Sequence, residues 1–373
     1  MEAVIKSAPQ DGPPGTEIRD CPVPKPGPDE VLIRVAAAAI CGTDKHIYKW
    51  DPSIRDSVTP PRIYGHEFCG FVEALGDRAQ RGYEGELHVG DYVSAEMHVV
   101  CGECPQCRSG NGHICIRTKI YGLHEDGAFA EFVKVPSANI IKLGPYVPLR
   151  VGAFLDALGN AVHATQIVDL AGKSVAITGF GPIGAMAAAI AEHSGAATVV
   201  VTDVSDHALE TARRWAASRT FANLHTFNVK TTSAADVKRA VDAITDGVGV
   251  DVVLEMSGAP TAINLGLDIV RMGGLLSLLG LPTGHAVTID DYTRNVIFKG
   301  VTLQGIIGRR MYATWQRMLS LLRSGLDVDW IVQATFDSLR EFHTGMSRFD
   351  RHEALKVVFF PEGEEKAQAR LRG

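Results

Sequence analysis

The second half of the chain alternates short apolar runs with longer amphipathic segments, and this alternation constrains the fold most strongly. From Lys173 onward, SVAIT precedes the helix-like PIGAMAAAIAEHSG, and ATVVVTD precedes SDHALETARRWAAS. The order continues with AADVKRAVDAIT, VDVVLEMSG, PTAINLGLDIVRMGG, LLSLLG and TLQGIIG. Strands and helices that alternate in this way form a parallel sheet with helices on both faces. We therefore predict an α/β protein that contains a doubly wound parallel sheet.

The first part of the chain, residues 1–160, has a different pattern. Its strand-like runs follow one another closely between turn residues, as in VLIRVAAAAI, FVEALG, DYVSAEM and AEFVKVP. This spacing is typical of a β-rich, barrel-like unit. A chain of 373 residues exceeds the size at which one core stops growing. We therefore predict a β-rich domain over 1–160, the parallel-sheet domain over 161–307 and a C-terminal segment over 308–373, whose last twelve residues, EGEEKAQARLRG, are expected to fray.

The composition is that of an ordinary soluble protein. Hydrophobic residues make up 46% and charged residues 21%, and the net charge is −6 without a block of like charges. This balance indicates neither a nucleic-acid partner nor a membrane surface. The N-terminus lacks the features of a secretion signal, and no apolar run reaches the length of a spanning helix. We expect a cytoplasmic protein, and a reducing cytosol argues against disulfides.

A glycine-rich turn opens the parallel-sheet region. Gly179-Phe-Gly181-Pro-Ile-Gly184 follows the strand SVAIT and begins a helix, which is the context that makes a GxGxxG pattern informative. The glycines permit a tight turn, close approach of a pyrophosphate and close helix packing. Asp203, about twenty residues on, can bind both ribose hydroxyls and would repel a 2′-phosphate. The pattern favours NAD over NADP, the alternative being a glycine turn that binds nothing.

Four of the seven cysteines lie within fifteen residues, at positions 101, 104, 107 and 115. Three chemistries compete for this spacing: disulfides, a redox dithiol, or one metal held by four thiolates, with an iron–sulfur cluster possible on ligands alone. Zn²⁺ takes four soft ligands in a tetrahedron, and short x2 loops can fold two thiolates onto one ion. A redox pair would require a thioredoxin-like setting, whereas this segment lies among turns. The pattern favours a structural zinc, because four protein ligands leave no open position.

A second cluster precedes this lobe. Cys41-Gly-Thr43-Asp-Lys-His46 and Gly65-His66-Glu67 supply a thiolate, imidazoles and a carboxylate. A thiolate and an imidazole suit zinc, and a carboxylate or water completes a shell with room for substrate. Taken singly, Cys41 is more often a small buried residue and His66 an ordinary hydrogen-bonded histidine. Their joint occurrence before a nucleotide-binding region favours a catalytic metal.

Together these features resemble the zinc-dependent medium-chain alcohol dehydrogenase family over nearly the full length. The landmarks are GHE (65–67), the four-cysteine lobe, GFGPIG and the order of the two domains. The resemblance implies a GroES-like β-rich catalytic domain, a Rossmann NAD-binding domain and a C-terminal segment that returns to the catalytic domain. Within the family, the similarity is greatest to the threonine 3-dehydrogenases, and it is carried by AICGTDKHIYKWD, LDALGNAVHAT, GFGPIGAMAAAIAEHSGA, VVVTDVS, LEMSGAP and FKGVTLQGIIGRRMYATW.

The resemblance implies roles for individual residues and for cofactors. Cys41, His66 and Glu67 would bind a catalytic zinc, Thr43 and His46 would relay a proton, and Asp156 would sit beside the metal. The resemblance implies NAD, one catalytic and one structural Zn²⁺, and a homotetramer that oxidises L-threonine to L-2-amino-3-oxobutanoate. The residues expected to line the NAD site are Gly179, Gly181, Ile183, Gly184, Asp203, Leu279, Gly280, Leu281, Ile306 and Ile307.

Alternatives remain open at this level. Polyol dehydrogenases share the Cys-Gly-x-Asp-x-His start but usually have Glu-Pro where this chain has Asp156-Ala157, so a polyol or vicinal-diol enzyme is the second reading. A non-catalytic NAD-sensing or structural protein is the third, although a sensor would have no need of an open metal site.

The chain departs from the family pattern at several positions. Ala208 replaces an arginine that touches the adenosine ribose in bacterial members, Ala157 replaces a proline, and Ile307 replaces a tyrosine near the nicotinamide. A short insertion lies around residues 80–88. For an amino-acid substrate, Asp156 is a candidate partner for the ammonium. Arg309 is either a partner for the carboxylate or a solvated surface cation.

Overall fold

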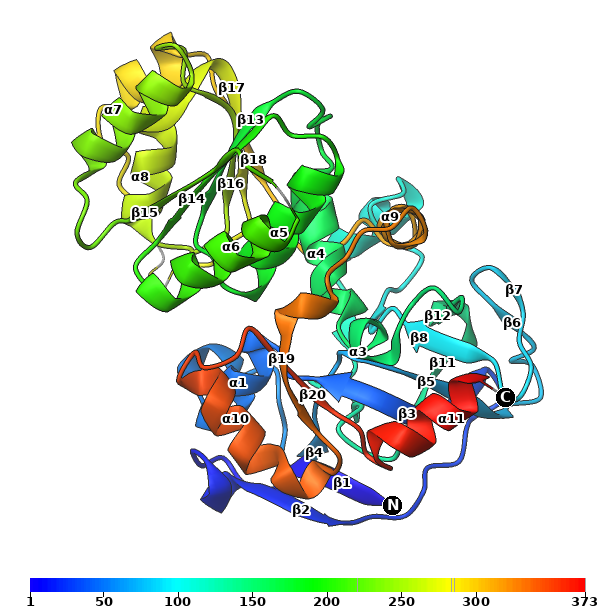
Figure 1. Cartoon of the computed structure of the whole chain (residues 1–373). Coiled ribbons are helices and arrows are strands. Elements are labelled where there is room, and N and C mark those ends of the chain that lie inside the picture. The colour runs from blue at the N-terminus through cyan, green and yellow to red at the C-terminus, as the bar shows by residue number, and fades with distance from the viewer. Residues whose placement is uncertain (220, 283, 285, 373) are drawn as a thin grey trace. The chain divides into compact units, whose positions relative to one another are not determined.

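The structure of the chain is a computed structural model that describes residues 1–219, 221–282, 284 and 286–372. The chain divides into two compact units, which are coloured along the chain in Figure 1. Met1–Ala157 and Arg310–Gly373 together form the first, which we call the N/C unit. Leu158–Arg309 forms the second, the central unit.

The N/C unit is built on one mixed sheet with strand order β12-β8-β5-β3-β20-β19, in which β11 also pairs with β3. Its long strands come from apolar runs such as EVLIRVAAAA, which is buried along most of its length. The strands are β3 (Glu30–Ala39), β5 (Phe68–Leu75), β8 (Tyr92–Ala95), β11 (Phe132–Pro136), β12 (Ile140–Lys142), β19 (Val332–Phe336) and β20 (Lys356–Phe359).

Shorter strands and helices surround this sheet. The strands are β1 (Glu2–Lys6), β2 (Thr16–Asp20), β4 (Arg62–Ile63), β6 (Arg81–Gly82), β7 (Gly85–Glu86), β9 (His98–Val99) and β10 (Lys119–Ile120). The helices are α1 (Gly42–Lys49), α2 (Pro105–Arg108), α3 (Leu149–Gly152), α9 (Ala313–Arg323), α10 (Phe342–Asp350) and α11 (Glu364–Arg372).

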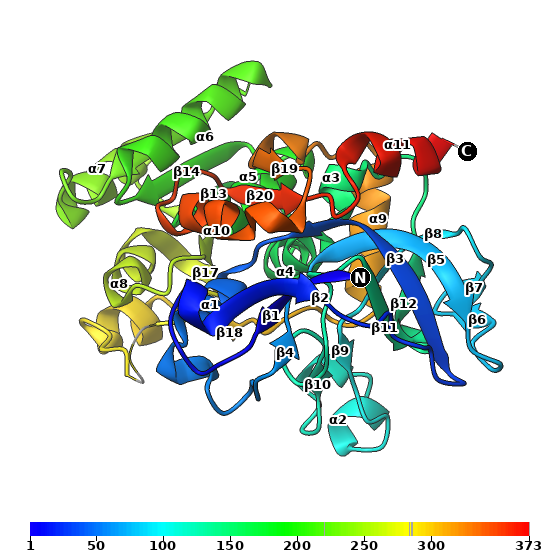
Figure 2. The same ribbon diagram turned by 90° about the horizontal axis from the view of Figure 1, so that it is seen from below.

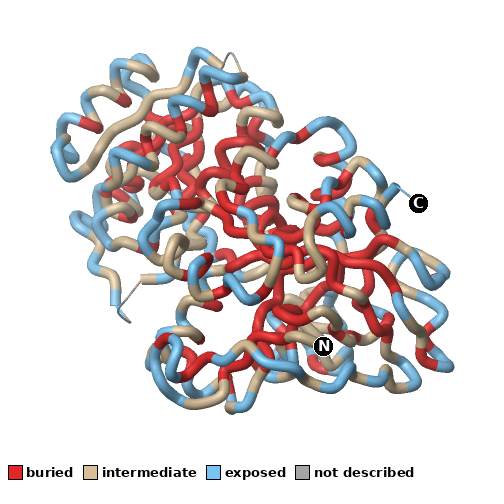
Figure 3. Tube along the Cα trace, turned by 60° about the horizontal axis from the view of Figure 1, so that its bottom comes forward, coloured by how far each residue is buried: buried red, intermediate tan, exposed pale blue. Residues whose placement is uncertain are grey.

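The C-terminal residues complete the sheet of the N/C unit. Strand β20 runs antiparallel to β3, with Val358 opposite Ala39, and the two strands can be followed in Figure 2. Phe342 and Phe359 from this segment pack against Phe129, with ring centroids 5.0 and 6.3 Å away. Figure 3 shows the buried core that results. The core therefore requires both ends of the chain.

The expectation that the last residues fray is wrong for most of them. They form α11, whose first turn carries Glu364 and Glu365 and whose last turn carries Arg370 and Arg372. This charge order suits the helix dipole. The helix is also anchored, because Ala367 is buried and the backbone N–H of Glu364 donates to the Asp337 carboxylate at 2.8 Å.

The central unit contains the predicted parallel sheet, so the α/β prediction is confirmed. Its strand order is β15-β14-β13-β16-β17-β18, and every neighbouring pair is parallel. Figure 1 shows α5 and α6 on one face and α7 and α8 on the other. The strands are β13 (Ser174–Thr178), β14 (Thr198–Asp203), β15 (Leu224–Asn228), β16 (Val250–Glu255), β17 (Val270–Leu278) and β18 (Thr302–Gly305). The helices are α5 (Pro182–His193), α6 (Asp206–Ser218), α7 (Ala234–Ile244) and α8 (Pro260–Ile269), while α4 (Leu155–Thr165) spans the boundary between the units.

The strand order reverses between β13 and β16. Strands β13, β14 and β15 progress in one direction, whereas β16, β17 and β18 progress in the other. In open α/β sheets, ligands bind in the crevice at the carboxyl ends of the strands at such a switch point. Among the described residues, no helix combines the length and apolar character needed to cross a membrane.

Candidate functional site

Cys41, His66 and Glu67 come together in the N/C unit. Cys41 lies between β3 and α1, and His66 and Glu67 immediately precede β5. Because β3 and β5 are antiparallel neighbours, with Ala38 opposite Phe68, the end of one strand lies beside the start of the other. The Sγ, a ring nitrogen and a carboxylate oxygen of the three residues lie within 4.8 Å of one another.

The chemistry of this cluster fits a bound cation. His66 and Glu67 are buried, and neither His66 Nδ1 nor Glu67 Oε1 has a hydrogen-bond partner in the described structure. Burial raises the pKa of the Cys41 thiol and the nearby Glu67 carboxylate raises it further. Burial likewise raises the pKa of Glu67. A thiolate and a carboxylate in such surroundings need a positive charge next to them, which a metal ion provides.

Lys356 provides a cation beside Glu67, and it was not predicted. This lysine begins β20, is fully buried, and donates from Nζ to Glu67 Oε2 and to the carbonyl oxygen of Ile40 at 2.9 Å. The contact holds one carboxylate oxygen of Glu67 and leaves Oε1 as the oxygen within reach of a metal. In the sequence, this role was indicated only by one charged residue, Lys356, at the start of the otherwise apolar segment KVVFF.

Helix α1 carries the two residues predicted to relay a proton. Thr43 Oγ1 lies 4.0 Å from Cys41 Sγ. His46, one turn later, is half exposed, and its Nδ1 lies 3.4 Å from an Asp51 carboxylate oxygen. The helix therefore begins at the metal cluster and carries a titratable side chain that reaches solvent. Asp44, between them, is fully buried 3.8 Å from His66 Nδ1, and burial raises its pKa.

Asp156 lies in the same region, together with two residues that the sequence analysis missed. It is buried at the start of α4, and its charge acts on both His66 and Glu67. Ligand atoms of Glu96, His98 and Asp156 lie within 4.8 Å of one another. Glu96 is buried and accepts from His98 Nδ1 at 2.8 Å. In the sequence, these residues were indicated only by the spacing of two ionisable side chains, Glu96 within DYVSAEM and His98 directly after it.

The four-cysteine lobe has the dimensions of a site for one ion. Tetrahedral zinc with Zn–S bonds of about 2.3 Å requires sulfurs roughly 3.8 Å apart. The Sγ–Sγ distances are 3.5 Å for Cys101–Cys115 and Cys104–Cys107, 3.8 Å for Cys104–Cys115 and 4.0 Å for Cys101–Cys107. None of the seven cysteines, all within the described residues, forms a disulfide. The lobe around α2 projects from the rest of its unit in Figure 2.

The surroundings of Cys101 favour its thiolate form. Backbone N–H groups of Glu103 and Cys104 lower the pKa of Cys101 to about 5, and the Arg117 side chain contributes to the same effect. Arg117 Nη2 donates to Cys101 Sγ at 3.4 Å. Hydrogen bonds to sulfur are typical of metal-bound thiolates, whose charge they help to stabilise.

In the central unit, the predicted glycine turn lies at the switch point. Gly179 has a φ of 93°, and a Cβ there would lie 2.9 Å from Ser257, so a side chain would be strained and crowded. A Cβ on Gly184 would lie 2.0 Å from the carbonyl oxygen of Gly179. In contrast, nothing lies within 4 Å of the Cβ position of Gly181. The open side of the turn is where a pyrophosphate would approach, next to the start of α5.

Glu255 connects this turn to the other predicted cofactor residues. Its buried carboxylate accepts from the N–H groups of Ser257 and Gly258 at 2.8 and 2.9 Å, and its carbonyl oxygen accepts from those of Leu279 and Gly280. Thr178 Oγ1, at the end of β13, donates to the same carboxylate at 3.4 Å, so the loops after β13, β16 and β17 lie together. Of the remaining predicted residues, Ile183 is partly buried, Ile306 is buried, and Leu281 and Ile307 are exposed.

Asp203 and Arg309 have surroundings that the sequence did not specify. Asp203 ends β14, and its carboxylate accepts from the N–H of Phe180 in the glycine turn at 2.6 Å.

Arg309 is only 2% exposed, so it is not a solvated surface cation. Its Nη1 donates to Asn160 Oδ1 at 3.1 Å, and a Cβ on Gly159 would lie 2.1 Å from its Cδ. Gly159 thus provides the space for a buried guanidinium.

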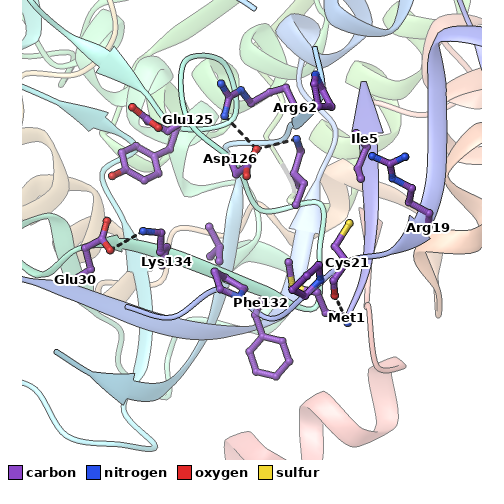
Figure 4. Close-up of a pocket in the computed structure, with 17 residues that line it drawn as sticks. Met1, Ile5, Arg19, Cys21, Glu30, Arg62, Glu125, Asp126, Phe132 and Lys134 are labelled. Carbon is purple, nitrogen blue, oxygen red and sulfur yellow. Dashed lines mark hydrogen bonds and ion pairs between the residues drawn. The ribbon is translucent and has the colours of Figure 1, made fainter. Parts of the chain in front are cut away.

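A separate cavity of about 360 Å³ lies in the N/C unit, and Figure 4 shows its lining. The predicted site residues are not part of this lining. Lys134 pairs with Glu30 at 2.8 Å and Arg62 pairs with Asp126 at 3.1 Å. Its charges therefore already have partners, and the cavity is distinct from the metal clusters.

Comparison with known families agrees with this geometry. Residues 27–145 match the alcohol dehydrogenase GroES-like domain, and residues 182–324 match the zinc-binding dehydrogenase domain. The chain belongs to the zinc-binding alcohol dehydrogenase family. In this family, the β-rich N/C unit is the GroES-like catalytic part and the central parallel sheet is the Rossmann part.

Several zinc-binding dehydrogenases are similar over nearly their whole length. An L-threonine 3-dehydrogenase of Caldanaerobacter subterraneus subsp. tengcongensis is 43% identical over 97% of this chain and 99% of its own. The structure of an alcohol dehydrogenase from Thermus sp. ATN1 has a TM-score of 0.82 and 30% identity, covering 97% of this chain and 100% of its own. A zinc-binding dehydrogenase from Sinorhizobium meliloti, solved bound to NADP, has a TM-score of 0.81 and 27% identity, with 96% and 99% coverage.

The glycine turn of this dehydrogenase generates a paired prediction. Gly184→Ala should lower the free energy of unfolding by roughly 1–3 kcal/mol, because the new methyl group forces α5 away from Gly179. Gly181→Ala should cost less than about 1 kcal/mol, since its Cβ enters open space. The same Gly181→Ala change should nevertheless weaken dinucleotide binding, because that space is where the cofactor approaches. Urea unfolding and calorimetric titration measure the two effects. Equal stability losses in both variants would contradict the assignment.

Proposed function

We propose that the protein oxidises the secondary hydroxyl of L-threonine to L-2-amino-3-oxobutanoate, with NAD as the hydride acceptor. The observation that carries this proposal is the near-full-length similarity to L-threonine 3-dehydrogenases, at 40–43% identity in several organisms. The buried carboxylate of Asp156 beside the Cys41, His66 and Glu67 cluster supports it, because such a group suits a cationic substrate.

The proposal assigns two zinc ions to the chain. Cys41, His66 and Glu67 would hold the catalytic ion, and the four cysteines of the lobe would hold the structural one. When bound, the catalytic zinc supplies Lewis-acid chemistry, which lowers the pKa of a coordinated alcohol. Lys356 keeps Glu67 in place and compensates part of its charge.

The residues of α1 carry away the proton that the alcohol loses. Thr43, whose hydroxyl lies next to Cys41, would accept this proton as it passes its own proton onward, and His46 would release a proton to solvent. Imidazole side chains commonly serve as proton shuttles in enzymes. The half-exposed position of His46 supports this role.

Two buried charges match the charged groups of an amino acid. Asp156 is the proposed partner of the ammonium, and Arg309 of the carboxylate. Arg309 is buried and donates to Asn160 Oδ1, and Gly159 leaves the space that its side chain occupies.

NAD is the proposed cofactor because Asp203 ends the second strand of the Rossmann unit, where a carboxylate disfavours a 2′-phosphate. The NADP-bound relative makes this choice worth testing directly. When bound, the nicotinamide supplies the hydride chemistry. The chain contributes the glycine turn and the loops after β16 and β17, which Glu255 holds together.

We further propose a cytoplasmic homotetramer. Strand β18 forms an edge of the Rossmann sheet, all four of its residues are exposed, and Leu303 presents an apolar side chain there. Free edges of this kind pair readily with another chain, which supports contact between subunits. Seven free cysteines favour a reducing compartment.

The metal assignment predicts two zinc ions per chain by elemental analysis. Cys107→Ser should remove one of them and lower stability, because structural zinc binding is also folding free energy. Cys41→Ser should abolish turnover and leave the lobe zinc in place. Cys21→Ser, which changes a thiol outside both clusters, is the control and should retain both ions. Full activity of Cys41→Ser with one zinc bound would refute the assignment.

The cofactor assignment predicts a strong preference for NAD over NADP in kcat/KM. Asp203→Ser should bring the kcat/KM values for NAD and NADP closer together. The change removes the carboxylate that binds the ribose hydroxyls, which should weaken NAD binding, and it also removes the charge that disfavours the 2′-phosphate. Asp206→Ser removes the same charge from the first turn of α6 and serves as the control. Wild-type enzyme that uses both cofactors equally well would show that Asp203 does not select between them.

The substrate assignment predicts that L-threonine exceeds 2-butanol, 2,3-butanediol and sorbitol in kcat/KM by orders of magnitude. Uncharged analogues lack the ammonium that Asp156 is proposed to bind, and a site built for a charged group rejects such analogues strongly. Asp156→Asn should lower the rate with L-threonine by orders of magnitude. Initial rates of NADH formation decide the question. If sorbitol or a butanediol were turned over faster than L-threonine, the protein would instead be assigned as a polyol or vicinal-diol dehydrogenase.

A further inference from the structure

The insertion around residues 80–88 forms a small hairpin, β6 and β7, whose Tyr83 contacts the rest of the N/C unit in three ways. The backbone N–H of Tyr83 donates to the carbonyl oxygen of Ile140 at 3.1 Å. The Tyr83 ring stacks on that of Tyr312, with centroids 4.0 Å apart and planes within 9°. Its hydroxyl accepts from Gln316 Nε2 at 3.3 Å. Two of these contacts are with the start of α9.

Tyr312 needs such support because its backbone conformation is unfavourable. It is the N-cap of α9 and has a φ of 69° and a ψ of −48°. A bulky residue with positive φ persists only where its surroundings hold it. The stacked ring of Tyr83 lies on one side, and the Tyr312 hydroxyl donates to the carbonyl oxygen of Ala138 at 3.3 Å.

The first turn of α9 also contacts the candidate active site. Trp315 is buried there, and its indole Nε1 donates to Glu96 Oε2 at 2.8 Å. The other oxygen of Glu96 accepts from both the backbone N–H and Nδ1 of His98 at 3.0 and 2.8 Å. Glu96 therefore fixes the orientation of the His98 ring near Asp156, while Trp315 fixes Glu96.

A second connection runs through the turn that Tyr312 touches. Asn139, next to Ala138, is buried and donates from Nδ2 to the carbonyl oxygens of Glu96 and His98 at 2.5 and 3.2 Å. Its own carbonyl oxygen accepts from the N–H of Glu96 at 2.9 Å. The negative charge of Glu96 also contributes to the raised pKa of Tyr312, about 12, which burial dominates. Tyr312 and the 96–98 segment thus lie close together.

We propose that the hairpin is a positioning element for the reaction: Tyr83 holds the first turn of α9, and through Trp315 and Glu96 it fixes His98 beside Asp156. This inference rests on the proposed function, in which Asp156 pairs with the substrate ammonium. Tyr83 itself is not among the residues proposed to bind substrate or cofactor. Replacing Tyr83 should make the positions of residues 96–98 less well defined.

The test compares the zinc-loaded Tyr83→Ala, Tyr83→Phe and Trp315→Phe variants with the wild type. Tyr83→Ala should raise the KM for L-threonine roughly fivefold and leave kcat within about twofold, because a displaced His98 weakens ground-state and transition-state binding alike. Tyr83→Phe retains the stacked ring and should restore the wild-type KM. Trp315→Phe should raise KM in the same way, and adding Tyr83→Ala to it should cause little further change, because both act through one contact.

Tyr146→Ala is the matched control. The Tyr146 ring lies 5.0 Å from the Arg323 guanidinium and its hydroxyl accepts from Arg323 Nη2 at 3.2 Å, so this change loosens the other end of α9. Its KM should stay within about twofold of wild type. A KM rise in Tyr146→Ala equal to that in Tyr83→Ala would overturn the proposal, as would a wild-type KM in Tyr83→Ala.

Hydrogen–deuterium exchange separates this proposal from the proposed function. Amides of residues 96–98 and 312–316 should exchange faster in Tyr83→Ala than in Tyr83→Phe or Tyr146→Ala. If the wild type does not oxidise L-threonine, the substrate assignment fails, and this exchange difference still supports positioning by the hairpin. Unchanged exchange in Tyr83→Ala overturns the positioning role whatever the substrate is.

Discussion

The buried ammonium of Lys356 is the contact on which the candidate metal site depends. It joins β20, near the end of the chain, to Glu67, which immediately precedes β5, and to Ile40, which immediately follows β3. Removing one partner of a buried ion pair typically costs about 3–5 kcal/mol, because the other charge stays buried. The same contact that orients Glu67 therefore also holds the C-terminal strand in the sheet, and site geometry and fold stability are coupled at one residue.

Sequence patterns predicted the fold class because its physical signals are local. The runs SVAIT, TVVVTD and VDVVLE have apolar centres, as strands buried on both faces of a sheet require, and capping residues such as Ser205 mark where helices begin. The terminus was mispredicted as frayed for the opposite reason. Helix α11 is short and polar, and its stability comes from contacts with residues distant in sequence, such as Asp337, which no local pattern reveals.

The site was predictable to the extent that its ligands have recognisable spacing. The four cysteines, the GHE segment and the glycine turn each carry a chemical requirement that can be read along the chain. Glu96, His98 and Lys356 carry none, because an isolated charged residue in a sequence resembles a solvated one. Arg309 shows the same difficulty, since only its surroundings, including the absent side chain of Gly159, establish that it is buried.

The N/C unit consists of two segments separated by the whole central unit, and this connectivity governs the order of folding during synthesis. The central unit is continuous, so its sheet can close once Arg309 has left the ribosome. The strands around Cys41 and His66 must wait for β20, more than 300 residues after β3, and contacts so distant along the chain form slowly. The central unit therefore matures before the N/C unit, although synthesis of the N/C unit begins first.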